Sequence, residues 1–323
     1  MIKEESEIPE IWMNKLTKVY DKGKQALKAV DEIDIVMEPG VHGFLGPNGA
    51  GKTTTINMLI GAISITSGRA KVKGRDAGSV SARRIIGFLP QDPPFYNNMT
   101  GEQYLTYVGG LSGLRKNEAK EKTQELLQKL GLLKAHDKII EKYSEGMKQR
   151  VGIAAALIHD PEILILDEPT SNLDPIGRDN IIKDIIKLSE RMSVFVSSHI
   201  LSEIEQMCDK VTMINKGKIV ITDTIKNIKK MHSLKGKTNL IILNTSLNEK
   251  MLSHLKEKDF IADIWIDEND NKIHIVSKDI EMLQKAIPKL LIDNNVILRE
   301  FYQPESSLQD IFIDLMTNEG NNV

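Results

Sequence analysis

A glycine-rich loop between two apolar segments constrains the fold of this chain more than any other feature. The loop is Gly46-Pro47-Asn48-Gly49-Ala50-Gly51-Lys52-Thr53, and the apolar run 41–45 precedes it. After it, apolar residues recur at helical spacing at Ile56, Met58, Leu59 and Ile63. Glycines let backbone N–H groups approach phosphate oxygens, and the start of a helix favours an anion. The pattern predicts a strand, a phosphate-binding loop and a helix; the alternative is a glycine-rich turn that matches by chance.

The loop also carries the side chains that nucleoside triphosphate chemistry needs. Lys52 is expected to reach the β- and γ-phosphates, and the Thr53 hydroxyl is expected to ligate magnesium. Thr54, which follows, belongs to the same expected set of nucleotide contacts. The sequence therefore predicts a bound nucleoside triphosphate with Mg²⁺.

Two adjacent carboxylates form a second candidate site. Asp167 and Glu168 directly follow the apolar run 163–166. Buried carboxylates are costly unless they meet a cation or hydrogen-bond donors, and ligands of α/β sheets bind at the carboxyl ends of strands. We expect Asp167 to support magnesium and Glu168 to act as a general base toward an attacking water. The alternative is that both carboxylates cap a helix in the following loop.

The order of apolar runs and helical patterns predicts an α/β core. Short apolar runs at 86–89, 163–166 and 194–196 alternate with helical patterns, as in parallel strands that are buried on both faces. Helices are expected at about 118–130 and 145–158, and Gly131 stands where a left-handed helix end would need it.

The pattern changes after Ile221, and we expect a nucleotide-binding domain at 1–225, a lysine-rich linker at 226–237 and an accessory domain at 238–323. The last part predicts a β-α-β-β-α-β order, typical of a ferredoxin-like unit, with strands at 240–243, 261–266, 273–276 and 296–302. A capping box at 246–249 is expected to start its first helix, and Pro288 is expected to weaken its second. Residues 307–316 are expected to form an extra amphipathic helix.

Composition excludes several other classes of protein. With 323 residues, 41% of them hydrophobic and 27% charged, the chain has the composition of a folded globular protein. Its net charge of -2 provides no overall basic field for nucleic acid or anionic lipid. The single cysteine, Cys208, excludes an internal disulfide and fits a reducing compartment. No signal-like start and no long apolar stretch is present, so any membrane role is expected to depend on a partner.

Several further residues, in order along the chain, give a specific resemblance. They are Tyr20 before the glycine loop, Gln91 after the run 86–89, the segments 143–147 and 171–174, and His199 after the run 194–196. Over residues 10–221 the chain resembles the ATP-binding cassette (ABC) ATPases, the nucleotide-binding subunits of ABC transporters. Each residue alone is ambiguous, since Tyr20 could be an ordinary aromatic, Gln91 a solvated loop residue and His199 a structural histidine.

The resemblance implies a role for each residue. Tyr20 would stack on adenine, Gln91 would reach magnesium beside the surface that receives the membrane partner, and His199 would contact the γ-phosphate. Asp174 belongs to the segment that matches the D-loop of the family. The implied fold is a P-loop NTPase core with an antiparallel β subdomain and a helical subdomain at about 92–160.

The segment 143–147, Tyr-Ser-Glu-Gly-Met, departs from the family's usual signature Leu-Ser-Gly-Gly-Gln at three positions. Ser144 and Gly146 are kept, and the resemblance makes these two the γ-phosphate contacts. Glu145 would repel phosphate, so it is expected to face solvent or a basic neighbour. Ser144 is also expected to suit the start of a helix as its N-cap, which is compatible with both roles.

The resemblance implies a function as well. Two subunits, identical or related, would enclose two ATP molecules and drive export through a separate membrane permease, at the cytoplasmic face of the cell membrane. The exporter type rests on the similarity of residues 306–312 to the tails of such ATPases. The alternative is a soluble ABC ATPase that regulates a ribosomal or DNA partner; the single cassette and the absence of net basic charge argue against it. A catalytically inactive regulator is disfavoured because Lys52, Thr53, Gln91, Glu168 and His199 are all present.

Overall fold

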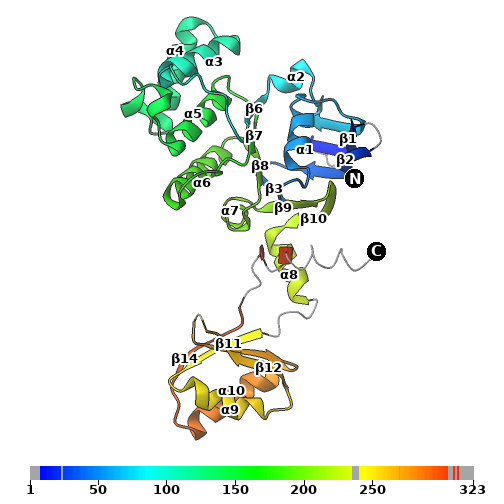
Figure 1. Ribbon diagram of the computed structural model, residues 1–323, viewed down its shortest axis with the longest axis vertical. Coiled ribbons are helices and arrows are strands. Elements are labelled where there is room, and N and C mark those ends of the chain that lie inside the picture. Colours follow the sequence, from blue (N-terminus) through cyan, green and yellow to red (C-terminus); the bar gives the residue numbers. More distant parts are fainter. Residues whose placement is uncertain are drawn as a thin grey trace, which may run out of the picture. The chain divides into compact units, whose positions relative to one another are not determined.

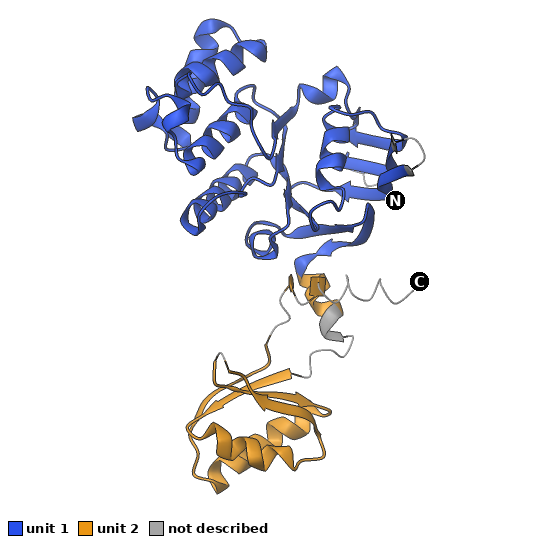
Figure 2. Ribbon diagram, viewed as in Figure 1, with its two compact units in different colours: residues 1–225 blue, residues 226–323 orange. Residues whose placement is uncertain are grey.

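The computed structural model describes residues 8–22, 25–234, 240–268, 270–304, 308–309 and 311–312. The chain divides into two compact units, residues 1–225 and residues 226–323 (Figures 1 and 2). Among the described residues, no helix combines the length and the apolar character that crossing a membrane would require.

A six-stranded sheet with the order β10-β9-β3-β8-β7-β6 forms the centre of the first unit (Figure 1). Five of the strands are parallel, and β10 pairs with β9 in the antiparallel direction. The strands are β3 (Val41–Leu45), β6 (Ile86–Leu89), β7 (Ile163–Asp167), β8 (Ser193–Ser198), β9 (Lys210–Asn215) and β10 (Lys218–Thr224). The predicted buried strands are confirmed: every residue of β7 and β8 is buried.

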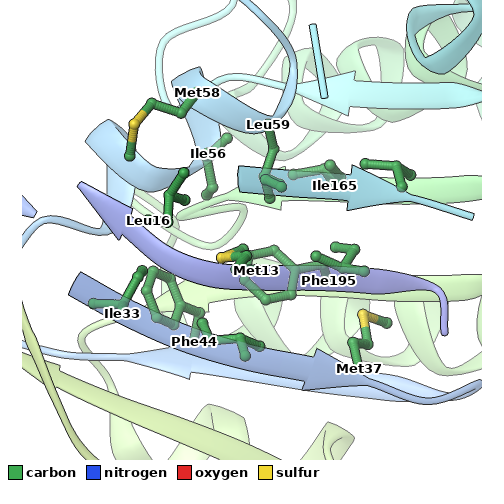
Figure 3. Close-up of a cluster of buried hydrophobic side chains, with 14 of the residues drawn as sticks. Met13, Leu16, Ile33, Met37, Phe44, Ile56, Met58, Leu59, Ile165 and Phe195 are labelled. Atoms are coloured by element: carbon green, nitrogen blue, oxygen red, sulfur yellow. The ribbon is translucent and has the colours of Figure 1, made fainter. Parts of the chain in front are cut away.

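A second, antiparallel sheet has the order β2-β1-β4-β5. Its strands are β1 (Ile11–Lys22), β2 (Gln25–Met37), β4 (Ser67–Val72) and β5 (Arg75–Asp76). Alternate residues of β1 and β2 pack against Phe44 of β3, Phe195 of β8 and the apolar face of α1 (Lys52–Leu59), as Figure 3 shows. This core fixes the position of the glycine loop, which connects β3 to α1.

Of the remaining helices of the first unit, the five between residues 101 and 157 lie within the predicted helical subdomain at about 92–160, and three lie outside it. The helices are α2 (Val80–Arg83), α3 (Gly101–Leu111), α4 (Lys116–Lys129), η1 (Leu133–Ala135), η2 (Ile140–Lys142), α5 (Glu145–Leu157), α6 (Pro175–Ser189) and α7 (Leu201–Met207). Gly131 has the predicted left-handed conformation after α4, with φ of 68°. The predicted helix after the glycine loop included Ile63, but α1 ends at Leu59, and Ile63 packs on the core from beyond the helix.

The second unit contains a four-stranded antiparallel sheet with the order β12-β13-β11-β14. Along the chain, its elements are α8 (Ile225–Leu234), which starts at the boundary, then β11 (Leu240–Thr245), α9 (Asn248–Lys256), β12 (Ile261–Ile266), β13 (Ile273–Ser277), α10 (Ile280–Asp293) and β14 (Leu298–Tyr302). From β11 onward the order is the predicted β-α-β-β-α-β. One apolar cluster joins α9 and α10 to the sheet.

Three details of this second unit differ from the sequence expectations. Most of the segment expected to be a linker forms helix α8, because lysine is a good helix former and Ile228 is buried. The capping box at 246–249 is not formed; instead Asn248 Oδ1 accepts hydrogen bonds from the backbone and the hydroxyl of Thr245. Helix α10 continues through Pro288, since its apolar face is buried. The expected helix 307–316 lies mostly outside the described residues, of which 308–309 and 311–312 are helical.

His42 on β3 is a buried histidine that makes the stability of this core sensitive to pH. Its side chain stacks on Phe195, and its Nε2 lies 2.8 Å from Thr212 Oγ1. Burial, with a smaller contribution from the positive charge of Lys210, lowers the pKa of His42 from 6.5 to about 4.

We predict that this histidine destabilises the fold as the pH falls below 6.5. Between the two pKa values the unfolded chain binds more protons than the folded one, so stability rises with pH in this window. At pH 5 the contribution of His42 amounts to about 2 kcal/mol of lost stability. Urea unfolding at pH 7.5 and pH 5 should therefore show a larger loss for the wild-type protein than for His42→Gln. Equal losses in both proteins would contradict the prediction.

Candidate active site

The glycine loop has backbone conformations and close contacts that only glycine allows at several of its positions. Gly49 and Gly51 have φ of 79° and 111°, a region that favours glycine. A Cβ atom on Gly46 would lie 2.4 Å from the backbone oxygen of Ile214, and one on Gly51 would lie 2.7 Å from that of Ala29. The loop therefore runs close against β9 and β2, which leaves no room for a side chain at Gly46 or Gly51.

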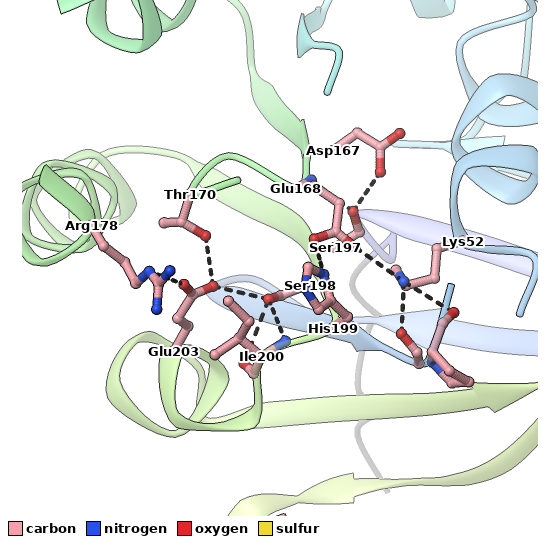
Figure 4. Close-up of polar contacts among 12 residues, drawn as sticks. Lys52, Asp167, Glu168, Thr170, Arg178, Ser197, Ser198, His199, Ile200 and Glu203 are labelled. Carbon is pink, nitrogen blue, oxygen red and sulfur yellow. Dashed lines mark hydrogen bonds and ion pairs between the residues drawn. The ribbon is translucent and has the colours of Figure 1, made fainter. Parts of the chain in front are cut away.

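Lys52, the first residue of α1, is a buried cation at the centre of the site. Its Nζ donates to the backbone oxygens of Gly46 at 2.7 Å and Pro47 at 3.3 Å. It also forms an ion pair with Glu168 Oε1 at 3.0 Å, in which both side chains are about 5% exposed (Figure 4). The structure thus brings the two predicted residues from distant parts of the chain into direct contact.

Glu168 lies between Lys52 and His199. Its Oε2 is 2.6 Å from His199 Nδ1, and the histidine side chain is 42% exposed (Figure 4). Glu168 has φ of 51°, a left-handed conformation that is unusual for a residue with a side chain. Backbone strain of this kind persists where the surroundings hold the residue, and it often marks a functional position.

Asp167 ends β7 beside Glu168 and is 2% exposed. Burial raises the pKa of Asp167, and hydrogen bonds from Ser197 and Thr53 act in the opposite direction. The hydroxyl of Ser197 donates to Asp167 Oδ1 at 2.6 Å. The Asp167 carboxylate and the Thr53 hydroxyl provide the oxygen ligands that Mg²⁺ prefers. This ion commonly takes only one or two protein ligands beside phosphate oxygens.

A second buried network, which the sequence analysis missed, lies behind these residues. Glu203 on α7 is 1% exposed and accepts hydrogen bonds from Thr170 at 2.6 Å and Ser198 at 2.9 Å. It also forms an ion pair with Arg178 of α6 at 3.1 Å (Figure 4). The serines directly before His199 were a signal that could have been used, whereas a glutamate on a short helix gives no sequence signal of burial.

The signature and D-loop residues gather at a different pocket. Ser144 is the N-cap of α5 and Asp174 is the N-cap of α6, and both line a pocket of about 460 Å³ together with Gly146. No atom lies within 4 Å of a Cβ placed on Gly146. Glu145 pairs with Lys148 and is 61% exposed, as expected.

Two further predicted residues lie on other segments. Gln91 is exposed in the loop after β6, where it lines a pocket of about 270 Å³ with residues of α5 and the segment 171–173. Tyr20 is partly exposed on β1, opposite Leu27 of β2, and Lys18 Nζ lies 5.2 Å from the centre of its ring. Ala29, two residues after Leu27, meets the glycine loop, so Tyr20 belongs to the hairpin that borders this loop.

Comparison with known proteins identifies the family. A family model described as ABC transporter matches residues 30–171. The bacitracin transport ATP-binding protein BcrA of Bacillus licheniformis is 37% identical over 310 residues, which cover 93% of this chain and 95% of that protein. The linearmycin resistance ATP-binding protein LnrL of Bacillus subtilis (strain 168) is 33% identical over 276 residues, 84% and 88% of the two chains. The chain belongs to the ABC transporter ATP-binding proteins. It is therefore an ATPase subunit of a transporter, and these relatives favour that function over a ribosomal or DNA partner.

Solved structures of ABC proteins share the fold. An ATP-binding subunit of an ABC transporter has a TM-score of 0.61 at 25% identity, covering 70% of this chain and 94% of that chain. The ATP-binding cassette MJ0796, solved as a dimer bound to ADP and Pi, has a TM-score of 0.61 at 21% identity, covering 67% and 98%. The predicted P-loop NTPase fold with an antiparallel β subdomain and a helical subdomain is confirmed.

Replacing Lys52 tests the buried ion pair. We expect Lys52→Met, which keeps most of the length of the side chain, to lower the free energy of unfolding by roughly 3 kcal/mol, because Glu168 loses its buried cation. ATP affinity should fall at least about tenfold, since the phosphates lose the same cation. Lys285→Met removes a cation that is 79% exposed and pairs with the similarly exposed Glu281, so it should cost less than about 1 kcal/mol. Urea unfolding and ATP titration measure both effects; the same small effect from both variants would argue against the site.

Proposed function

We propose that two copies of this ATPase, or one copy and a related chain, enclose two ATP molecules and thereby drive export through a separate membrane permease. The observation that carries this proposal is the contact of Glu168 with both Lys52 and His199 at the edge of the glycine loop. A buried base that touches both a phosphate-binding lysine and a partly exposed histidine is suited to hydrolysis of a phosphate bond.

Each residue at the loop has a role in this proposal. The backbone of the glycine loop and Lys52 bind the β- and γ-phosphates, and Tyr20 stacks on adenine. Glu168 accepts the proton of the attacking water, and His199, which contacts Glu168 and is partly exposed, contacts the γ-phosphate. Thr54, in the first turn of α1, is a further contact to the nucleotide in this proposal.

Thr53, Asp167 and Gln91 are the residues that would hold Mg²⁺. Thr53 and Asp167 fit this ion, because both offer oxygen and the Thr53 hydroxyl acts to lower the pKa of the Asp167 carboxyl. Bound Mg²⁺ supplies charge neutralisation at the phosphates. Asp167 is kept in position by the strand β7 that it ends.

The second subunit would complete each site with Ser144, Gly146 and the nearby Asp174. In support, these residues line an open pocket, and Ser144 caps the start of α5, where a helix N-terminus favours an anion. The names of the bacitracin and linearmycin relatives support the exporter type. We place the protein at the cytoplasmic face of the cell membrane, bound to its permease, and assign residues 238–323 a role in steadying or regulating the dimer.

Glu168→Gln tests the assigned base. Glutamine keeps the size of the side chain and removes the proton acceptor, so we expect turnover to fall at least 100-fold while ATP affinity stays within about threefold. Glu162→Gln, at the other end of the same strand, is the control, because its carboxylate is 44% exposed and pairs with surface cations. Phosphate release and ATP titration give the two quantities. Wild-type turnover in Glu168→Gln would mean that the base lies elsewhere.

Ser144→Arg tests the shared site. In the Glu168→Gln background, which should accumulate the ATP-bound dimer, we expect Ser144→Arg to bind ATP normally but to sediment as a monomer, because arginine fills the pocket that the second subunit's ATP would enter. Ser112→Arg, at the exposed end of α3, is the matched control and should still dimerise. Normal ATP-dependent dimers of Ser144→Arg would contradict the shared site.

A further inference from the structure

Ser197 is a buried serine that contacts the Asp167 carboxylate and the backbone of Glu168. It lies on β8 and is fully buried. Its Oγ donates to Asp167 Oδ1 at 2.6 Å and accepts a hydrogen bond from the backbone N–H of Glu168 at 3.0 Å (Figure 4). The backbone oxygen of Ser197 also accepts from this N–H at 3.2 Å.

These contacts lie at the end of β7, where the backbone adopts an unusual conformation. Asp167 and Ser197 are direct neighbours in the parallel pairing of β7 and β8, so the hydroxyl is fixed against the end of β7. The next residue, Glu168, turns into a left-handed conformation with φ of 51°. The hydrogen bonds that the N–H of Glu168 donates to Ser197 stabilise this turn. The hydrogen bond from the Ser197 hydroxyl fixes the direction of the Asp167 carboxylate.

The adjacent serine makes a different set of contacts. Ser198 Oγ donates to Glu203 Oε2 at 2.9 Å and accepts from the backbone N–H of Ile200 at 2.9 Å. It is as deeply buried as Ser197, with an exposure of 1%. The two serines therefore provide the same chemistry in the same strand, and only Ser197 contacts Asp167 and Glu168.

We propose that Ser197 is a positioning residue for hydrolysis, which orients the Asp167 carboxylate toward a nucleotide-bound divalent cation and holds the backbone of Glu168. The proposal rests on the Mg²⁺-dependent ATPase proposed above. Groups that orient a metal-binding carboxylate commonly change metal affinity or activity by 10- to 100-fold when they are removed. Ser197→Ala removes one hydroxyl and almost no volume, so it separates this role from packing.

The test compares Ser197→Ala with Ser198→Ala in the full-length protein. A fluorescent ATP analogue is titrated in EDTA and again in Mg²⁺, and bound Mn²⁺ is measured by electron paramagnetic resonance. We expect Ser197→Ala to bind the analogue normally in EDTA, to need roughly tenfold more Mg²⁺ or Mn²⁺, and to hydrolyse ATP more slowly. Ser198→Ala should keep the wild-type cation requirement. Ser197→Cys, with a weaker donor, should lie between wild type and alanine.

The outcomes separate this inference from the proposed function. A wild-type protein that binds and hydrolyses ATP without any divalent cation would overturn both. If the wild type requires the cation and Ser197→Ala has the same requirement, only the role of Ser197 is overturned. Equal weakening of analogue binding in EDTA and in Mg²⁺, accompanied by a lower melting temperature, would make Ser197 a structural residue and would also overturn the proposal.

Discussion

The buried ion pair between Lys52 and Glu168 is the interaction on which the arrangement of the site depends. Removing either residue would leave the other without this partner, and an unpaired buried charge lowers the stability of the protein by several kcal/mol. The pair joins the start of α1 to the end of β7, and His199 extends it to the end of β8. Three segments that are distant in sequence are thus held at one edge of the sheet by charge as well as by packing.

Much of this edge could be predicted because the relevant signals are local. The run 163–166 is apolar because β7 is buried on both faces, and the polar side chains after it must lie where the strand ends. Gly46 and Gly51 are set by close backbone neighbours that no side chain could tolerate. The β-α-β-β-α-β order of the second unit followed from alternating short patterns in the same way.

The parts that could not be predicted depend on contacts between distant residues. Glu203 stands on a seven-residue helix that gives no sequence signal of a buried carboxylate, and its partners come from two other segments. The prediction of a capping box at the start of α9 was wrong, because the Ser246 hydroxyl instead accepts a hydrogen bond from the backbone N–H of Ile297, 51 residues later. The lysines of α8 indicate a linker, whereas the burial of Ile228 depends on tertiary packing that the local sequence does not show.

The signature pocket shows how one hydroxyl can serve structure and binding together. Ser144 Oγ accepts a hydrogen bond from the backbone N–H of Met147, which caps α5. A hydroxyl that accepts in this way keeps its own proton, so it can still donate to an anion. Asp174 makes the equivalent cap on α6 as an acceptor only, through Gly177. Of these two caps, Ser144 is therefore the one suited to meet a phosphate, and it is one of the two signature residues that this chain keeps.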